Sequence, residues 1–465
     1  MNKRYPLPHI RQRLLILVGL LFFYPYQSGS ACTIGAFTAA VMSEGRAVLW
    51  KNRDVNNPDQ AMKFLRGKRF AYITNVYAGE TENAWAGINE AGFAIMNSNS
   101  YNLSGYSDGA DDGNIMALAL GTCATVDDFA RLLDSFNIVG RETPANYGVF
   151  DNLGNVAIFE ASHTYYTRCD VRADSLGFLL RANYSMSGGP SRLLGKNRYQ
   201  RAMALCLPAK RENRLSIEFL IQTLARDLGQ VDFDPYPLPF TRTLPPLPRG
   251  YLPTDTTISR ATTRSVEIIV APAPGASPAS GMIWVLLGEP IASLPVPLWL
   301  SAETVPGAMD GKITAPLCDE AQKLTRYLYS DPNFPKAVNT FRLARWLEHI
   351  APVESTIFAT VREKEAQWGL SGPPPESARA LTESICQLVL NTYQEFWKNI
   401  DLEMLPLALK SIVLPSPGTA GRLPAPGFTL YDPLGRRVTH KPKSAGIFFL
   451  YNGRTRQRLV VLKTI

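Results

Sequence analysis

The feature that most constrains this chain is an apolar run near its start, which is followed by small residues and a cysteine. Residues 14–23 are all apolar or glycine, follow a basic stretch, and precede the small residues Ser28-Gly29-Ser30-Ala31. A basic segment, a short apolar core and a small-residue cleavage site are typical of a secretory leader. The apolar run is too short for a comfortable membrane span. We therefore predict that residues 1–31 are a signal peptide and that the exported chain begins at Cys32.

A lipoprotein signal is the alternative, because such signals also end at a cysteine. Lipidation would consume the thiol and the amine of Cys32 together. The residue three positions before Cys32 is Gly29 rather than an aliphatic residue, which favours ordinary cleavage. The expected location is outside the cell or at its surface, with passage through the periplasm.

The composition of the chain is that of a globular protein. Of 465 residues, 46% are hydrophobic and 19% are charged, which allows one large domain with additions or two to three domains. Half of the net charge of +8 comes from Lys3, Arg4, Arg11 and Arg13 in the leader. The remaining net charge of +4 on the rest of the chain is only weak evidence for a nucleic-acid partner. None of the six cysteines forms a C-x-x-C pair, so a zinc site or a thioredoxin motif is not indicated.

Residues 32–290 show patterns of strands and helices. Alternating apolar residues at 32–41 and 47–50, around the turn Ser43-Glu44-Gly45, predict a hairpin. Thr125-Val126-Asp127-Asp128 has the form of a capping box and predicts a helix over 129–136. Further strands are predicted at 70–77, 84–88, 93–97, 147–151, 156–160, 177–183, 265–270 and 282–287, and further helices at 195–206 and 216–228.

Residues 311–410 change to helical periodicity. Helices are predicted at 315–329, 335–350, 353–367 and 377–400, followed by a Pro/Gly linker at 415–426 and strands at 428–431, 437–439, 446–451 and 457–462. We therefore divide the chain into a leader (1–31), a main domain (32–310), a helical extension (311–412) and a linker with a small β module (413–465).

Cys32 is the candidate nucleophile, and a cysteine nucleophile needs a base that accepts its proton. Only His163 of the three histidines after the leader lies in the main domain; His349 and His440 lie in the extension and the tail. Cleavage before Cys32 supplies another base, because a free α-amine has a reference pKa of about 7.7–8.0. The amine and the thiol belong to one residue, so the covalent structure holds them close together.

The segments after Cys32 carry a recognisable series of motifs: Cys32-Thr33-Ile34, Trp50-Lys51-Asn52-Arg53-Asp54, Gly87-Ile88-Asn89-Glu90-Ala91-Gly92-Phe93, Asn99, and Arg181-Ala182-Asn183-Tyr184-Ser185. In this order they resemble the N-terminal-nucleophile linear amide hydrolases, over residues 32 to about 300. That clan includes choloylglycine hydrolase, penicillin V acylase, acid ceramidase-like amidases and aminopenicillanate acyltransferase, and the similarity is greatest to the acyltransferase and carcinine-hydrolase-like group. The resemblance implies an α+β fold, a four-layer αββα sandwich with Cys32 at the start of a central strand, and no cofactor or metal.

The resemblance also implies roles for Cys32 and the residues of the second motif. Cys32 is the nucleophile, its amine is the base, and Asp54 matches the acid that holds this amine. The family usually has arginine where this chain has Lys51. This departure leaves Arg53 as an alternative cation.

Three further residues match the family pattern. Asn99 matches the residue whose backbone N–H faces the oxyanion, and Asn183 matches the residue whose side-chain amide completes the oxyanion hole. Arg198, in Asn197-Arg198-Tyr199, matches an arginine late in the site.

Each of these residues also has a structural interpretation. Asp54 and Asn183 each follow or end a strand, where they are common turn residues. Arg198 lies on a predicted amphipathic helix, where a surface or ion-pair role is the alternative. Asn97 and Asn102 lie near Asn99, so the choice of Asn99 is a choice of register. Glu160 ends a predicted strand and could line the pocket.

The implied reaction is thiolate attack on the carbonyl of a small-molecule acyl amide. A thioester forms, and water, or another amine in a transferase, resolves it. Two alternatives remain, a dipeptidase of the same superfold and a non-catalytic exported binding protein. A screen of acyl amides against dipeptides distinguishes an amidase from a dipeptidase. Cys32→Ser distinguishes an enzyme from a binding protein, because it would leave the function of a binding protein unchanged.

The last 40 residues resemble a C-terminal sorting domain of the bacterial type IX secretion route. The resemblance lies in Gly427-Phe428-Thr429-Leu430-Tyr431-Asp432-Pro433-Leu434-Gly435-Arg436, in Ser444-Ala445-Gly446-Ile447-Phe448-Phe449-Leu450 and in Arg458-Leu459-Val460-Val461-Leu462-Lys463. It implies that the tail is an address recognised by the secretion machinery. An ordinary small β-sandwich module is the alternative.

Overall fold

The computed structural model describes residues 31–403 apart from 106 and 173, and the strands 429–431, 446–451 and 456–461. Most of the predicted leader, the linker 415–426 and the predicted strand 437–439 lie outside these residues. The chain forms two compact units, Met1–Trp397 and Lys398–Ile465. The predicted boundary at 310/311 therefore falls inside the first unit.

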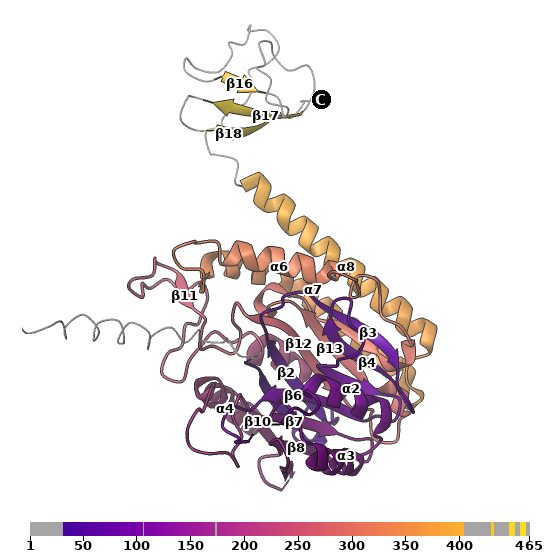
Figure 1. Cartoon of the computed structure of the whole chain (residues 1–465). Coiled ribbons are helices and arrows are strands. Elements are labelled where there is room, and N and C mark those ends of the chain that lie inside the picture. The colour runs from indigo at the N-terminus through magenta and orange to yellow at the C-terminus, as the bar shows by residue number, and fades with distance from the viewer. Residues whose placement is uncertain are drawn as a thin grey trace, which may run out of the picture. The chain divides into compact units, whose positions relative to one another are not determined.

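A six-stranded antiparallel sheet contains the strand that begins directly after Cys32 (Figure 1). Its order is β10 (Phe178–Arg181), β1 (Thr33–Phe37), β2 (Val48–Asp54), β12 (Thr263–Val270), β13 (Met282–Leu287) and β14 (Val296–Trp299). Every residue of β1, β2 and β13 is buried. Continuous burial means that both faces of these strands are covered, which places β1 and β2 inside the molecule.

A seven-stranded antiparallel sheet follows the order of the sequence. It comprises β3 (Gln60–Arg66), β4 (Ala71–Tyr77), β5 (Ala86–Asn89), β6 (Ala94–Asn99), β7 (Ala145–Phe150), β8 (Val156–Ala161) and β9 (Tyr166–Asp170). Strands β6 and β7 contact β1 and β2 of the first sheet. The two sheets therefore pack face to face.

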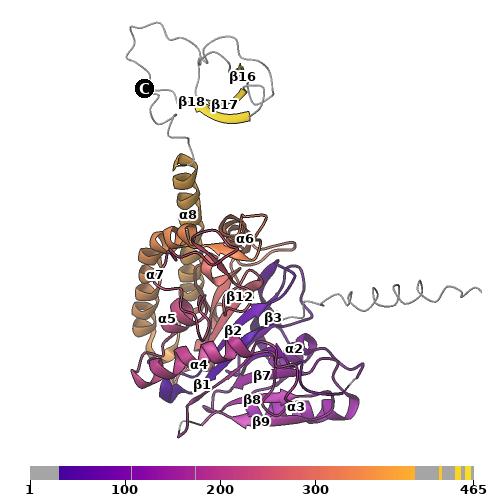
Figure 2. The same ribbon diagram turned by 90° about the vertical axis from the view of Figure 1, so that its left-hand side faces the viewer.

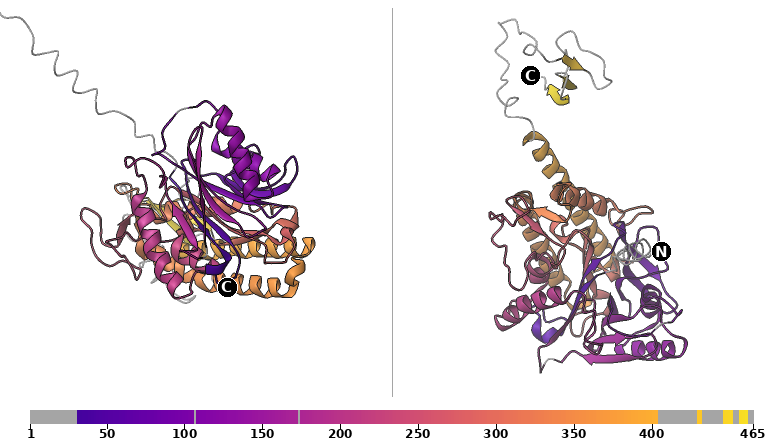
Figure 3. Two further views of the ribbon diagram at one scale, coloured as in Figure 1. Left: turned by 90° about the horizontal axis from the view of Figure 1, so that it is seen from below. Right: turned by 60° about the vertical axis from the view of Figure 1, so that its left-hand side comes forward.

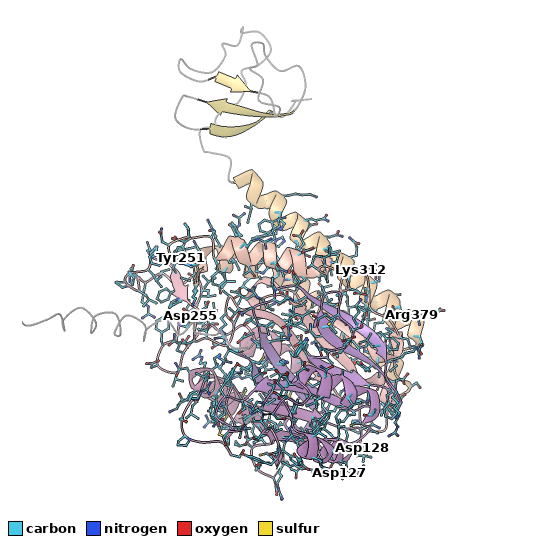
Figure 4. All side chains as sticks on the ribbon, viewed as in Figure 1. Asp127, Asp128, Tyr251, Asp255, Lys312 and Arg379 are labelled. Carbon is cyan, nitrogen blue, oxygen red and sulfur yellow. The ribbon has the colours of Figure 1, made fainter. Side chains whose placement is uncertain are left out.

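Helices α2 (Asp112–Thr122) and α3 (Val126–Val139) lie over the seven-stranded sheet. Phe129 of α3 packs edge-on against Tyr147 and Phe159 in the core beneath. The capping box predicted at Thr125 is confirmed: the Thr125 hydroxyl accepts from the Asp128 N–H, and the Asp128 carboxylate accepts from the Thr125 N–H. Figure 4 shows Asp128 at the start of this helix.

Helices from the second half of the chain and α4 (Lys196–Arg211) lie on the side of the six-stranded sheet (Figures 2 and 3). They are α6 (Pro316–Leu328), α7 (Thr340–Trp368) and α8 (Pro375–Glu403). Phe358 of α7 packs on Trp284 of β13, and the Tyr393 hydroxyl of α8 donates to the Ala292 carbonyl. The predicted αββα sandwich is confirmed.

The other elements of the first unit are short. They are β11 (Tyr251–Pro253) paired with β15 (Ala337–Asn339), α5 (Ile217–Phe219), a π-helical turn Leu220–Leu224, and single 3-10 turns at Ala39–Val41, Pro278–Ser280, Pro290–Ala292, Leu300–Ala302 and Gly369–Ser371. The second unit contains one antiparallel sheet of β16 (Thr429–Tyr431), β17 (Gly446–Tyr451) and β18 (Arg456–Val461). None of the described helices is long and apolar enough to cross a membrane.

Three predicted helices differ from the structure. One helix, α7, replaces the predicted helices 335–350 and 353–367, and it contains Pro352. Buried contacts on both sides of this proline, from Ile350 and Ile357, offset the hydrogen bond that it removes. The helix begins at Thr340, because the Asn339 side chain accepts from the N–H groups of Phe341 and Arg342. The predicted helix 216–228 is only α5 and the π-helical turn.

Candidate active site

Cys32 immediately precedes β1, between β10 and β2, and its side chain is buried. The backbone before it is also held. The Ala31 N–H donates to the Asp54 carbonyl at 3.0 Å, and the Ala31 carbonyl accepts from Arg260 Nη2 at 3.1 Å. The predicted cleavage position therefore lies within the folded body of the first unit.

The thiol is in surroundings that favour its neutral form. Burial raises the pKa of Cys32, the Lys51 charge opposes this effect, and the Asp54 charge adds to it. A thiol that remains protonated is a weak nucleophile. The site therefore needs a base that removes the proton as the sulfur reacts.

Asp54 ends β2 and is buried. Its Oδ2 accepts from Arg260 Nε at 2.9 Å and lies 2.8 Å from Arg260 Nη2, and its Oδ1 accepts from the Thr263 hydroxyl at 2.6 Å. The carboxylate is thus fixed by a guanidinium and a hydroxyl from a loop and strand about 200 residues further along the chain.

Arg198 joins the nucleophile to Asn183. Its Nη1 donates to the Cys32 carbonyl at 2.7 Å and to the Thr33 hydroxyl at 2.6 Å, and its Nη2 donates to Asn183 Oδ1 at 2.7 Å. The same Nη1 lies 3.9 Å from Asp54 Oδ2. Burial, and then the neighbouring Arg260, lower the pKa of Arg198 to about 10. The alternative of a surface arginine is wrong, because only 3% of Arg198 is exposed.

Asn99 and Asn183 lie in contact. Asn183 Nδ2 donates to the Asn99 carbonyl at 3.1 Å, while Asn183 Oδ1 faces Arg198. These bonds fix the orientation of the Asn183 amide, with its nitrogen toward Asn99. The neighbouring Asn102 instead bonds the carbonyls of Ser185 and Gly189. The oxyanion roles of Asn99 and Asn183 stay predictions.

The two candidate cations of β2 have different surroundings. Lys51 Nζ donates to the Trp85 carbonyl and to Asn97 Oδ1, both at 2.6 Å, and its charge lowers the pKa of Cys32 more than that of Arg53 does. The Arg53 guanidinium lies 4.4 and 4.6 Å from the rings of Tyr77 and Trp85. Lys51 is therefore the cation that acts more strongly on the thiol.

Each of the two described histidines has a ring nitrogen within hydrogen-bond distance of a backbone carbonyl. His163 Nδ1 lies 2.7 Å from the Arg141 carbonyl, and His349 Nε2 lies 3.2 Å from the Thr392 carbonyl. His440 lies outside the described residues. Glu160 is also occupied, because it pairs with Arg181 at 2.6 Å and accepts from the Met186 and Ser187 N–H groups.

Arg260 and Thr263 were not among the site residues predicted from the sequence. Arg260 lies in a loop and Thr263 begins β12, so no local periodicity distinguishes either residue from its neighbours. Within the described part of the chain, no group of three histidine, cysteine or carboxylate side chains is arranged to hold a metal ion.

Residues 41–202 match the model of the family described as acyl-coenzyme A:6-aminopenicillanic acid acyl-transferase. No curated protein matches the chain. Similar solved structures include a variant of conjugated bile acid hydrolase from Clostridium perfringens, with 14% identity and a TM-score of 0.35 over 55% of this chain and 89% of that one. Another is penicillin V acylase from Agrobacterium tumefaciens, with 16% identity and a TM-score of 0.34 over 58% of this chain and 85% of that one. A third is the N-acylethanolamine-hydrolyzing acid amidase orthologue of Caenorhabditis elegans, with 13% identity and a TM-score of 0.33 over 51% of this chain and 92% of that one.

Proposed function

We propose that this chain, which carries a domain of the N-terminal-nucleophile hydrolase family, is an exported amidase that uses Cys32 as its nucleophile. It cleaves a linear, non-peptide amide of a small molecule through a thioester, and it can pass the acyl group to an amine in place of water. One observation carries the proposal: a single buried guanidinium, Arg198, bonds both the Cys32 backbone and the Asn183 amide. The nucleophile and the candidate oxyanion donor are thereby held together.

The base in this proposal is the α-amine of Cys32. Removal of Ala31 frees two groups that now bind it, the Asp54 carbonyl and Arg260 Nη2. The new amine then belongs to the residue whose buried thiol needs a base. The Asp54 carboxylate, fixed by Arg260 and Thr263, stabilises the ammonium form of the amine during the reaction.

The reaction proceeds in two halves. The thiol proton moves to the amine while the sulfur attacks the amide carbon, and the carbonyl oxygen becomes an oxyanion that accepts from the Asn99 N–H and from Asn183 Nδ2. Each such donor is typically worth about 3–4 kcal/mol of the barrier. The ammonium then donates its proton to the departing amine, which leaves a thioester. Water attacks the thioester carbon with the α-amine as base, and the thiol and the carboxylic acid are released.

Arg198 and Lys51 support this chemistry without exchanging protons. Arg198 fixes the orientation of the Asn183 amide through Oδ1, so that its nitrogen is the end presented to the oxyanion. Lys51 supplies the positive charge that partly offsets the cost of a buried thiolate.

The test compares three forms of the protein with N-acyl amide substrates. A form that keeps residues 1–31 should be nearly inactive, because its Cys32 nitrogen is an amide without basicity. An engineered protease site that releases Cys32 should restore turnover. His163→Ala in the released form should retain activity. Full activity of the uncleaved form would exclude the amine as the base. That result together with loss of activity in His163→Ala would identify His163 as the base.

The nucleophile is tested in the same assay. Cys32→Ala should abolish turnover, and Cys32→Ser should lower it strongly, because an alkoxide is much harder to generate than a thiolate. Unchanged circular-dichroism spectra serve as the control for folding. Turnover by Cys32→Ala would contradict the proposal. N-terminal sequencing of the secreted protein gives the cleavage position directly.

A further inference from the structure

Asp112 is the first residue of α2, in the outer helix layer, yet its side chain reaches inward to the site. Its Oδ2 accepts from Asn97 Nδ2 at 2.5 Å, and Asn97 Oδ1 accepts from Lys51 Nζ at 2.6 Å. All three residues are buried, with exposed fractions of 6%, 2% and 1%. A buried hydrogen-bonded chain therefore runs from helix α2 across strand β6 to the lysine of β2.

Lys51 lies on the same face of the sheet as the thiol. It is opposite Ile34 in the β1–β2 register, and Cys32 lies two residues before Ile34. Side chains two residues apart along a strand share a face, and such diagonal neighbours are within reach of a long side chain. Lys51 is the largest opposing charge that acts on Cys32. The position of its ammonium therefore bears directly on the thiol.

The protonation of Asp112 controls the orientation of the Asn97 amide. An ionised carboxylate can only accept hydrogen bonds, so it requires the NH₂ end of Asn97 and leaves the carbonyl end for Lys51. A protonated carboxyl, or an amide in its place, can also donate. Asn97 could then reverse and present its NH₂ group to the ammonium, which would remove one of the two acceptors that hold Lys51.

Four other groups act on Lys51 and Asp112. Glu267 is opposite Lys51 on β12, Arg53 lies on β2, Cys32 precedes β1 and Asp111 adjoins Asp112. Burial raises the pKa of Glu267, although Lys51 and Arg53 oppose this effect. Burial also raises the pKa of Asp112, to about 6, and Lys51 opposes the rise. Asp112 is therefore ionised above about pH 6 and can act as the counter-charge there.

We propose that Asp112, acting through the Asn97 amide, is a positioning residue that holds the Lys51 ammonium against the Cys32 sulfur and so sets the reactivity of the thiol. This inference rests on the proposed role of Cys32 as the nucleophile. It concerns a residue on a different structural layer from the nucleophile, and it gives a function to the lysine that stands where the family usually has arginine.

The test uses iodoacetamide on the released chain, because the thiolate displaces iodide without any need to know the substrate. The alkylation rate of the Cys32 peptide is followed by mass spectrometry from pH 5 to pH 9. The unmodified chain should show an inflection near pH 6, with faster reaction above it. Asp112→Asn should lose this inflection and react about tenfold more slowly at pH 7, the effect of a rise of about one unit in the thiol pKa.

Asp111→Asn is the matched control. It removes one carboxylate from the same end of α2, and asparagine caps a helix about as well as aspartate. Asp111 makes its cap with the Asn114 N–H and is not part of the hydrogen-bonded chain to Lys51. The alkylation rate at pH 7 should therefore persist in Asp111→Asn, and so should the inflection, at a slightly lower pH because the Asp111 charge raises the pKa of Asp112.

A double-mutant cycle separates positioning from general structure. If Asp112 acts through Lys51, Asp112→Asn should have no further effect in a Lys51→Met background. Equal effects of Asp111→Asn and Asp112→Asn, or additive effects of Asp112→Asn and Lys51→Met, would overturn the inference. Turnover of N-acyl amides by Cys32→Ala, whatever the alkylation rates, would instead count against the proposed nucleophile itself.

Discussion

Arg226–Glu354 and Arg260–Asp54 are two buried arginine–carboxylate pairs in different regions of the first unit. Arg226 binds both oxygens of Glu354 on α7 and also donates to the carbonyls of Pro290 and Ser293. Arg260 binds Asp54 beside the thiol and also donates to the Ala31 carbonyl. The difference lies in their other partners.

Every acceptor of Arg226 belongs to the permanent body of the protein, so this pair joins the π-helical region and the turn between β13 and β14 to helix α7. One acceptor of Arg260 belongs to the residue that the proposed cleavage removes. Charge and burial alone therefore do not distinguish a structural pair from a functional one. The identity of the remaining hydrogen-bond partners does.

The largest effects should come from breaking each pair. Glu354→Gln should lower the free energy of unfolding by about 3–5 kcal/mol, because it leaves a buried guanidinium unpaired, and the remaining folded protein should keep its kcat. Asp54→Asn should lower kcat by about 10²-fold or more, the usual scale for loss of acid–base function. Urea unfolding and turnover per folded molecule, measured on both variants, check the contrast.

An exposed pair provides the control for these variants. Arg172 and Asp174 are both largely exposed, and Asp174→Asn should leave the free energy of unfolding nearly unchanged. The comparison fails if Asp54→Asn retains full kcat. It also fails if Glu354→Gln lowers the kcat of the folded protein as much as Asp54→Asn does.

A third buried carboxyl, Glu289, sharpens the comparison because a hydroxyl rather than a guanidinium binds it. Tyr329 of the segment after α6 donates to Glu289 Oε1 at 2.6 Å, and burial raises the pKa of Glu289 to about 8. Between its ordinary pKa of 4.5 and about 8, the unfolded chain loses this proton and the folded chain keeps it. The free energy of unfolding should therefore fall as pH rises through this window.

Glu289→Gln tests this pH dependence, since glutamine stays neutral throughout. Relative to the unmodified chain, the variant should gain stability steadily from pH 5 to pH 8. Urea unfolding of both proteins at pH 5, 6.5 and 8 measures the difference. Parallel stability curves would show that Glu289 titrates normally or not at all in this window.

Asp54 and the cap at Thr125 show which features the sequence alone can reveal. The strand before Asp54 and the cap at Thr125 were predictable because their signals lie within a few residues, in the alternation of 47–50 and in the Thr-x-x-Asp pattern. The Arg260–Asp54 pair joins residues 206 apart in the chain. No local pattern encodes a contact at that separation.

Helix α2 and the chain from Asp112 to Lys51 were missed for a related reason. Gly113 and Gly121 lower the helical propensity of α2, and the helix forms because its buried side packs on the seven-stranded sheet. Asn97 entered the sequence analysis only as a rival to Asn99. Its bonds to Lys51 and Asp112 become visible only when the two sheets and the helix are assembled.

The smallest effect on turnover should come from the tail, which the structure places in a separate compact unit beginning at Lys398. All the residues of the candidate site lie in the first unit, so deletion of residues 415–465 should leave the kcat of the purified protein unchanged. If the tail is a sorting address, the same deletion should abolish export. The protein would then accumulate inside the producing cell, and fractionation with an activity assay on each fraction measures both effects.

A variant whose residues 415–426 are replaced by a Gly/Ser stretch of equal length, with the β strands kept, is the matched control and should be exported normally. Export of the deleted form would contradict the sorting role, and loss of turnover by well-folded truncated protein would show that the comparison between site and tail is wrong.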